Sequence, residues 1–372
     1  MASVPKINNV EETNNVLKFT LSEVNVSYAN AIRRTIISEV PCIVIRTQPY
    51  SKNDVNIIIN RTRLNNELIK QRISSIPIYI QEIEQFPYED YILELEKENT
   101  ENTIIFATSE DFKIKNIKTD KYLQSAEVKK IFPPDPITGD YIDIVRLRPQ
   151  MANNMDKEMI KFEAKLSIGT AKEDGMFNVA CTCAYGNTLD PVRIKDEWEI
   201  KHKELKESFS KDKIDFLKKD WMLLDAKRLF LENSFDYIIE SVGVFNNFQL
   251  IELACSILIK KMYITIESLK NNNDLITDAI DTMDNCYIII LENEDYTIGK
   301  MLEYNLYNKY FVEKKELNYV GFLKKHPHDN NSIIKLAFKN IIQKDDILLT
   351  LEECANSAIL LLNTIKDYFS DK

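Results

Sequence analysis

The sequence predicts an α+β protein of two related modules that pack as a pseudo-symmetric pair, the first interrupted by a mainly β insertion. Three observations carry this prediction. A motif of strand, capped helix and apolar stripe occurs twice, 270 residues apart. Each module ends in a long helix with one apolar face, and the region from residue 82 to about 190 shows short strand patterns. A chain of 372 residues is also longer than one hydrophobic core ordinarily accommodates, so two or three domains are expected.

Composition limits the classes of function. The formal charge of −10 and the pI near 5.1 argue against a large nucleic-acid footprint, although one small basic patch stays compatible with them. The first fifteen residues are polar and acidic, and no apolar run approaches the roughly 18 residues of a membrane span. We therefore expect a soluble intracellular protein without a targeting segment. The six cysteines are scattered among apolar neighbours and are expected to be small core residues in a reducing compartment.

The first copy of the motif is the stretch Leu21–Val40, which follows a strand pattern from residue 16 to 21. Ser27 is the expected N-cap, and Pro41 is the expected stop signal. Helical spacing places five apolar side chains on one arc, namely Ala29, Ile32, Ile36, Ile37 and Val40. This arc predicts a helix with a buried face.

Two arginines follow each other on this helix. Arg33 falls inside the apolar arc and Arg34 lies beyond its edge. One interpretation is that Arg33 extends its guanidinium past an apolar stem into water. The other is that the helix meets a second protein and directs an arginine at a carboxylate or carbonyl group of that partner. The spacing alone leaves both open.

The chain between the two copies has its own pattern of elements. Asn65 or Asn66 is expected to cap a short helix, and residues 191–220 form a highly charged helical stretch. The expected strands cover residues 42–46, 55–59, 91–95, 103–108, 141–147, 159–168, 177–184 and 235–244, and a long helix covers 248–270. From this we expect residues 1–47 and 228–272 in the first module, 48–227 in the insertion and 273–372 in the second module.

The second copy of the motif is Leu291–Tyr310, followed by a long helix from residue 345 to 369. With this spacing Ser27 meets Thr297, and the buried positions that would pair the modules are Ala29 with Gly299, Ile32 with Leu302, and Ile36 with Leu306. Neither arginine recurs, because Glu303 and Tyr304 occupy the corresponding positions. The prediction is that the apolar stripe pairs the modules and that the arginines serve another contact.

Three groups of residues have types that bind metals, and each has a structural alternative. Cys181 and Cys183 are close-spaced on a strand but have no second ligand pair nearby. A solvated acidic helix face explains Asp274, Asp278 and Asp281. The segment His326-Pro-His328-Asp329 also fits a turn at an interface. We predict no metal and no cofactor, and no P-loop or aspartate triad indicates catalysis.

The first copy resembles the α-like subunits of DNA-directed RNA polymerases, namely bacterial α, the archaeal D-type protein and the eukaryotic third subunit. Their helix carries a pattern like T-L-x-N-A-L-R-R before a proline, matched here by residues 27–34 and Pro41. Their next element, N-x-S-x-L-x-D-E-x-I-x-x-R-x-x-x-I-P, is matched by Asn60, Thr62, Leu64, Asn66, Glu67, Ile69, Arg72, Ile76 and Pro77. The metal-binding cysteine clusters of some relatives are missing.

The second copy resembles the small α-like partner, which is the archaeal L-type protein or the eukaryotic eleventh subunit. Its patterns E-D-x-T-L-G-N and G-Y-x-x-P-H-P are matched by Glu294, Asp295, Thr297, Ile298 and Gly299, then by Gly321, Phe322, His326 and Pro327. Lys300 and Lys325 depart from these patterns. The two subunits are separate chains in cells, and their fusion here resembles the polymerases of large nucleocytoplasmic DNA viruses.

The resemblance implies a non-catalytic assembly platform, present once per polymerase, that binds the largest and second-largest subunits and small zinc-binding subunits. It implies little or no direct DNA contact, no membrane, and a location in virus factories and virions. The implied subunit-interface residues are Asn30, Arg33, Arg34, Glu67 and Arg72. A stand-alone scaffold with the same fold, and an enzyme using carboxylate or Cys/His groups, are the alternatives from other classes.

Overall fold

The computed structural model describes residues 4–150, 152, 155–207, 209–279 and 283–370. The chain forms two compact units. The first contains Met1–Thr35, Thr182–Glu240 and Asn247–Lys372, and the second contains Ile36–Cys181 and Ser241–Asn246. These limits differ from the boundaries expected at 47/48 and 227/228, because residues 36–47 belong to the second unit and residues 182–227 to the first.

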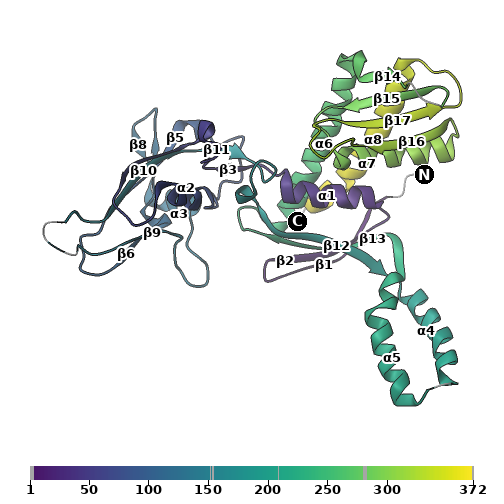
Figure 1. The fold of residues 1–372 in the computed structure, drawn as a ribbon, viewed down its shortest axis with the longest axis horizontal. Helices are drawn as coiled ribbons and strands as arrows, with labels where there is room; N and C mark the ends of the chain where they lie inside the picture. Colours follow the sequence, from purple (N-terminus) through teal and green to yellow (C-terminus); the bar gives the residue numbers. More distant parts are fainter. Residues whose placement is uncertain (1–3, 151, 153–154, 208, 280–282, 371–372) are drawn as a thin grey trace. The chain divides into compact units, whose positions relative to one another are not determined.

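One four-stranded sheet of the first unit comes from the N-terminal part of the chain, residues 1–272 (Figure 1). Its strands, in spatial order, are β1 (Lys6–Thr13), β2 (Val16–Ser22), β13 (Phe230–Ser241) and β12 (Ala180–Leu189). β2 pairs antiparallel with β13, and Leu21 lies opposite Phe235. The sequence did not predict β1, whose residues are polar and mostly exposed at the edge of the sheet.

A second four-stranded sheet comes from the C-terminal part, residues 273–372. Its order is β14 (Ile276–Asp278), β15 (Cys286–Leu291), β17 (Ser332–Phe338) and β16 (Leu317–Leu323), with antiparallel pairing throughout. Leu291 of β15 lies opposite Ser332 of β17, as Leu21 lies opposite Phe235 in the first sheet. Positions that correspond in this register are thus 270 residues apart in the part up to α1 and 97 residues apart from β13 onward. The strand corresponding to β16 is therefore β12, and the strand expected at residues 42–46, directly after Pro41, is not part of this sheet.

The helices of the first unit follow the same correspondence. α1 (Val26–Ser38) and α7 (Tyr296–Leu306) come after the central strands β2 and β15, and α6 (Asn247–Asn271) and α8 (Lys344–Ser370) come after β13 and β17. α6 contacts α8 in an antiparallel arrangement (Figure 1). The ring of Phe248 lies 6.2 Å from that of Phe369, and Lys270 Nζ lies 2.8 Å from Glu352 Oε1.

The helix α8 is long and apolar enough to cross a membrane by length and composition alone. Its apolar face is buried in the first unit, and Leu351, Ala358 and Leu362 are each 0% exposed. This is the pattern of the core helix of a globular domain.

The charged helical stretch expected at residues 191–220 consists of two helices. α4 (Pro191–Lys206) and α5 (Lys211–Leu223) lie side by side as a hairpin (Figure 1). The Asp190 carboxylate accepts hydrogen bonds from the first free N–H groups of α4, and Pro191 occupies a position where no N–H is needed. The rings of Trp198 and Trp221, 5.4 Å apart, form the centre of its small core.

The second unit is mainly β. Its sheets have the orders β4-β10-β5-β7-β8, β11-β3 and β6-β9. The strands are β3 (Cys42–Val44), β4 (Val55–Asn60), β5 (Tyr91–Glu98), β6 (Ile105–Thr108), β7 (Lys113–Asn116), β8 (Lys121–Tyr122), β9 (Asp143–Leu147), β10 (Met159–Lys165) and β11 (Ser167–Gly169). The helices α2 (Asn66–Ser74) and α3 (Ser125–Ile131) join a core that includes Ile73, Val128, Leu93 and Phe162.

Candidate functional site

The two motif helices begin at equivalent caps, but not at the residues expected from the sequence. The Oδ1 atom of Asn25 accepts hydrogen bonds from the N–H (2.9 Å) and the hydroxyl (2.6 Å) of Ser27. In α7, Asp295 Oδ1 accepts from the N–H of Thr297 at 2.9 Å. The prediction of Ser27 and Thr297 as caps is wrong by two residues in both copies. The 270-residue spacing is preserved, because Asn25 and Asp295 are also 270 apart.

Helices α1 and α7 contact each other and run antiparallel. Near the start of α1, the Tyr28 hydroxyl donates to Asn305 Oδ1 (3.0 Å), and its ring meets that of Tyr304 edge to face. Toward the end of α1, Arg34 reaches the start of α7. Burial raises the pKa of Tyr28 well above its ordinary value, while the hydrogen bond to Asn305 lowers it in part. The tyrosine therefore stays protonated and donates this hydrogen bond at neutral pH.

Arg34 binds the cap of α7. Its Nε donates to Thr297 Oγ1 at 2.9 Å, and its Nη2 lies 2.6 Å from Asp295 Oδ2. A guanidinium can make both contacts at once because its N–H groups form a rigid fork. The expectation that pairing of the two parts does not use Arg34 is therefore wrong.

Arg33 has a different environment on the same helix. Its Nε and Nη2 both donate to Asn30 Oδ1, at 3.1 and 2.9 Å, and its side chain is half-buried. Burial raises the pKa of Cys183 to about 12 and raises that of Tyr185, and in both the positive charge of Arg33 opposes the shift in part. Asn30 and Arg33 therefore lie together, and Asn30 orients the guanidinium. A role for this pair in docking stays a prediction.

The apolar positions expected to pair the modules are all buried. In α1 these are Ala29, Ile32 and Ile36, and in α7 they are Gly299, Leu302 and Leu306. Ile36 falls in the second compact unit, and the others fall in the first. Gly299 is small for a steric reason, since a Cβ atom there would overlap the ring of Phe322 on β16.

The variant Gly299→Ala is expected to lower the free energy of unfolding by about 1–3 kcal/mol, because the added methyl group overpacks the contact with Phe322. Urea denaturation measures the change. The double variant Gly299→Ala/Phe322→Ala should recover part of it, and Gly186→Ala, where nothing lies within 4 Å of the new Cβ, is the control. Equal losses in the two single glycine variants would contradict the steric explanation.

Glu67 and Arg72 lie on α2 of the second unit. Asn65 caps this helix, as one of the two expected alternatives, with its side chain accepting from the Leu68 N–H at 2.9 Å. Glu67 is exposed in the first turn, and Arg72 Nη1 donates to the carbonyl of Ile144 at 2.9 Å. Arg72 thus ties α2 to β9. An interface role for Glu67 and Arg72 stays a prediction.

Within the described part of the chain, no three His, Cys, Asp or Glu side chains gather as a metal site, and Asp281 lies outside it. The expected turn at His326 is present, since the N–H of His326 donates to Asp329 Oδ2 and the N–H of Asp329 donates back to the carbonyl of His326. Burial raises the pKa of the Cys42, Cys183, Cys255 and Cys354 thiols to about 12, so these are unreactive at neutral pH.

A charged cluster joins α8 to the π-helical turn Tyr307–Glu313 that continues α7. Glu353 lies 2.6 Å from Lys309 Nζ and 3.2 Å from Lys314 Nζ, and the Tyr310 hydroxyl also donates to it. The hydrogen bond from Lys309 is the main reason that the pKa of Glu353 falls from 4.5 to about 2.

Because the folded-state pKa of Glu353 is lowered, its contribution to stability is present above pH 4.5 and is lost as the pH falls toward 2. The variant Glu353→Gln should therefore flatten part of the acid dependence of unfolding between these values. Urea denaturation of both proteins at pH 6, 4 and 3 checks this expectation. Parallel pH profiles of wild type and variant would contradict it.

The sheets and their antiparallel helices form an α+β protein whose helix contacts join two parts of one chain. The chain belongs to the RNA polymerase Rpb3/Rpb11 dimerisation domain family, which it matches over residues 18–285. The match includes β2, α1, β13 and α6, and it ends before β15. The correspondence of β15, α7, β17 and α8 with the N-terminal elements rests on their order and register.

Curated proteins give the same assignment over shorter segments. The chain is 48% identical over 61 residues to DNA-directed RNA polymerases IV and V subunit 3B of Arabidopsis thaliana, covering 16% of this chain and 17% of that protein. It is 29% identical over 132 residues to subunit Rpo3 of Pyrococcus furiosus (34% and 44%), and 26% identical over 220 residues to DNA-directed RNA polymerase II subunit rpb3 of Dictyostelium discoideum (52% and 65%). The chain thus spans less than two thirds of each of these relatives.

Proposed function

We propose that the chain is a non-catalytic assembly subunit of a DNA-directed RNA polymerase and contains both members of a dimerisation pair. The observation that carries the proposal is the family match over residues 18–285, together with relatives that are themselves polymerase subunits. In this proposal the N-terminal part is the larger α-like module, interrupted by the second compact unit, and residues 273–372 are the small partner.

The contacts between the parts support a pseudo-two-fold pairing. Position 297 corresponds to 27 and position 304 to 34, so the contact of Arg34 with Thr297 joins positions 34 and 27. The contact of Tyr28 with Tyr304 joins positions 28 and 34. A two-fold rotation would therefore place these two contacts on nearly equivalent positions. The antiparallel packing of α6 on α8 agrees with such an axis.

Assembly would proceed by docking of the largest and second-largest subunits on the paired modules, with small zinc-binding subunits at the margins and little direct DNA contact. Arg33, oriented by Asn30, is the proposed contact on α1, and Glu67 and Arg72 are the proposed contacts on the inserted unit. The fusion of both modules in one chain suggests a viral polymerase, soluble in the virus factory and packaged in the virion.

Purification of the tagged full-length chain from cells that express it naturally tests this proposal. Mass spectrometry is expected to find the two largest polymerase subunits in the complex, each in equal amount with the chain. A stable complex that lacks them would instead indicate the stand-alone scaffold and overturn the proposal.

A further inference from the structure

The outer faces of the two four-stranded sheets differ in chemistry at corresponding positions. In the C-terminal sheet, Leu323, Ile333 and Ile290 lie opposite one another on adjacent strands and form an apolar row. Leu323 is 52% exposed, and the two isoleucines are half-buried. In the N-terminal sheet the positions corresponding to Ile290 and Ile333 are Thr20 and Asp236, which also lie opposite each other.

In the N-terminal sheet, the corresponding outer positions carry polar side chains that bond to one another. Asp236 Oδ1 accepts hydrogen bonds from the hydroxyls of Thr20 (2.8 Å) and Thr188 (2.9 Å), so its outer row satisfies its own polar groups. The same backbone arrangement therefore accepts polar side chains at these positions. Isoleucine at both positions of the C-terminal sheet exposes apolar surface that a solvated sheet does not require, which is typical of a contact surface.

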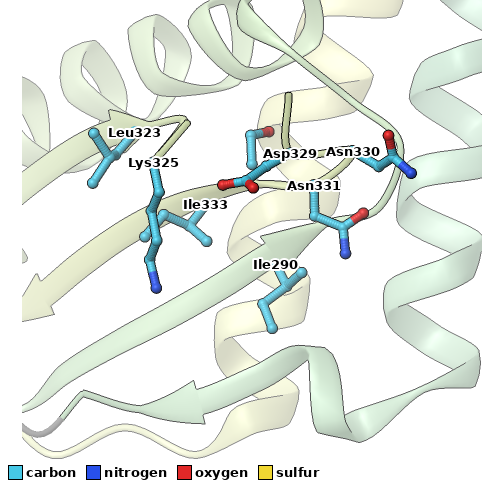
Figure 2. A pocket seen from close by; sticks show the side chains of 8 residues that line it. Ile290, Leu323, Lys325, Asp329, Asn330, Asn331 and Ile333 are labelled. Carbon is cyan, nitrogen blue, oxygen red and sulfur yellow. The ribbon is translucent and has the colours of Figure 1, made fainter. Parts of the chain in front are cut away.

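A pocket of about 340 Å³ lies over the apolar row. Figure 2 shows Ile290 and Ile333 beneath a polar rim that Asp329, Asn330 and Asn331 provide, with Lys325 beside Ile333. The volume is within the range that accommodates a large side chain or small ligand.

The loop at this rim is basic, in contrast to the chain as a whole. It reads Lys324-Lys325-His326-Pro-His328-Asp329, whereas the chain carries a net charge of −10. Among the described residues neither Lys324 nor Lys325 has a carboxylate within ion-pair distance, while Asp329 accepts from the backbone of His326. The two ammonium groups are therefore available for acidic groups of a partner.

We propose that this outer face binds a segment of another polymerase subunit that places a large apolar side chain on the row Leu323–Ile333–Ile290 and acidic side chains against Lys324 and Lys325. The apolar row would supply the buried centre of the contact, and the lysines would supply a charged rim that selects acidic neighbours. This inference rests on the proposed function, since it takes the partner from the same complex.

A photo-crosslinking amino acid at position 323 of the full-length chain, in the purified polymerase, tests the inference. The expected crosslink joins a protein segment in which Asp or Glu flanks a large apolar residue. Its yield should fall about tenfold or more in the variant Ile290→Thr/Ile333→Asp, which copies the residues of the N-terminal sheet. It should also fall in Lys324→Glu/Lys325→Glu. The control Ile238→Lys, on the outer face of the N-terminal sheet, should leave it unchanged.

Other outcomes overturn the inference in distinguishable ways. A chain that copurifies with the large subunits but gives no crosslink, or one to nucleic acid or to a segment without acidic residues, overturns this inference alone. An unchanged yield in Ile290→Thr/Ile333→Asp does the same. A chain that copurifies with no polymerase subunit overturns the proposed function, and this inference with it.

Discussion

The variant Lys261→Met is expected to lower the free energy of unfolding by about 3–5 kcal/mol, because it leaves a buried carboxylate without its cation. Lys261 Nζ on α6 lies 3.0 Å from Glu294 Oε2, next to the cap of α7, and the two side chains are only 16% and 10% exposed. Urea denaturation at neutral pH measures the loss. The exposed neighbour Lys260, replaced by methionine, is the matched control and should change stability little.

The proposed pseudo-symmetry supplies a second variant for the same ion pair. The positions that correspond to Lys261 and Glu294 on the other side of the pair are Ala358 and Val24, which are 0% and 1% exposed. Apolar side chains therefore fill the equivalent place. The double variant Lys261→Ala/Glu294→Val should be close to wild type in stability, since an apolar pair replaces both buried charges. A double variant as unstable as Lys261→Met would contradict this correspondence.

The variant Arg33→Glu is expected to weaken binding of the large polymerase subunits by about 2–5 kcal/mol, because in the proposed docking it would reverse one charge of a desolvated pair with the partner. Stability of the isolated chain should change little, since the hydrogen bonds of Arg33 go to Asn30 on the same helix. Co-purification and thermal unfolding, measured on the same preparation, separate the two effects.

Arg34→Ala is the matched comparison for Arg33→Glu. Arg34 is 36% exposed and Asp295 is 21% exposed, so screening by water limits the loss of stability to about 1 kcal/mol. This loss should come from the contact between α1 and α7. Recovery of the large subunits with Arg34→Ala should therefore stay normal. Normal recovery of the large subunits with Arg33→Glu would contradict the proposed role of Arg33.

The two motif helices could be predicted because the apolar stripe of each lies within one short stretch of sequence. The recurrence of the stripe after 270 residues can also be seen in the sequence alone. The cap was misplaced, since Asn25 and Ser27 are both good capping residues and only the backbone geometry distinguishes them. The partner of Arg34 could not be predicted, because Asp295 is 261 residues away and Tyr304 occupies the arginine position in the second copy. In the proposed pairing, the symmetry is only approximate, and different residues serve on the two sides.

The limits of the two compact units could not be predicted from the sequence patterns either. β3 lies within the strand expected at residues 42–46, directly after Pro41, but it pairs with β11 in the second unit. The strand that continues the first sheet is β12, and only its pairing partners reveal this. The edge strand β1 pairs with β2 along one edge, and most of its side chains are exposed, so its residues do not show the alternation of a half-buried strand. Its polar sequence therefore gave no strand signal.

Separation of the chain between residues 272 and 273 tests most directly whether one chain contains both members of a dimer. We expect residues 1–272 and 273–372, co-expressed as separate chains, to elute together as a one-to-one complex. The ion pair of Lys261 with Glu294 and the packing of α6 on α8 would hold them. Two fragments that each fold but elute separately at micromolar concentration would contradict the pairing of two modules within this chain.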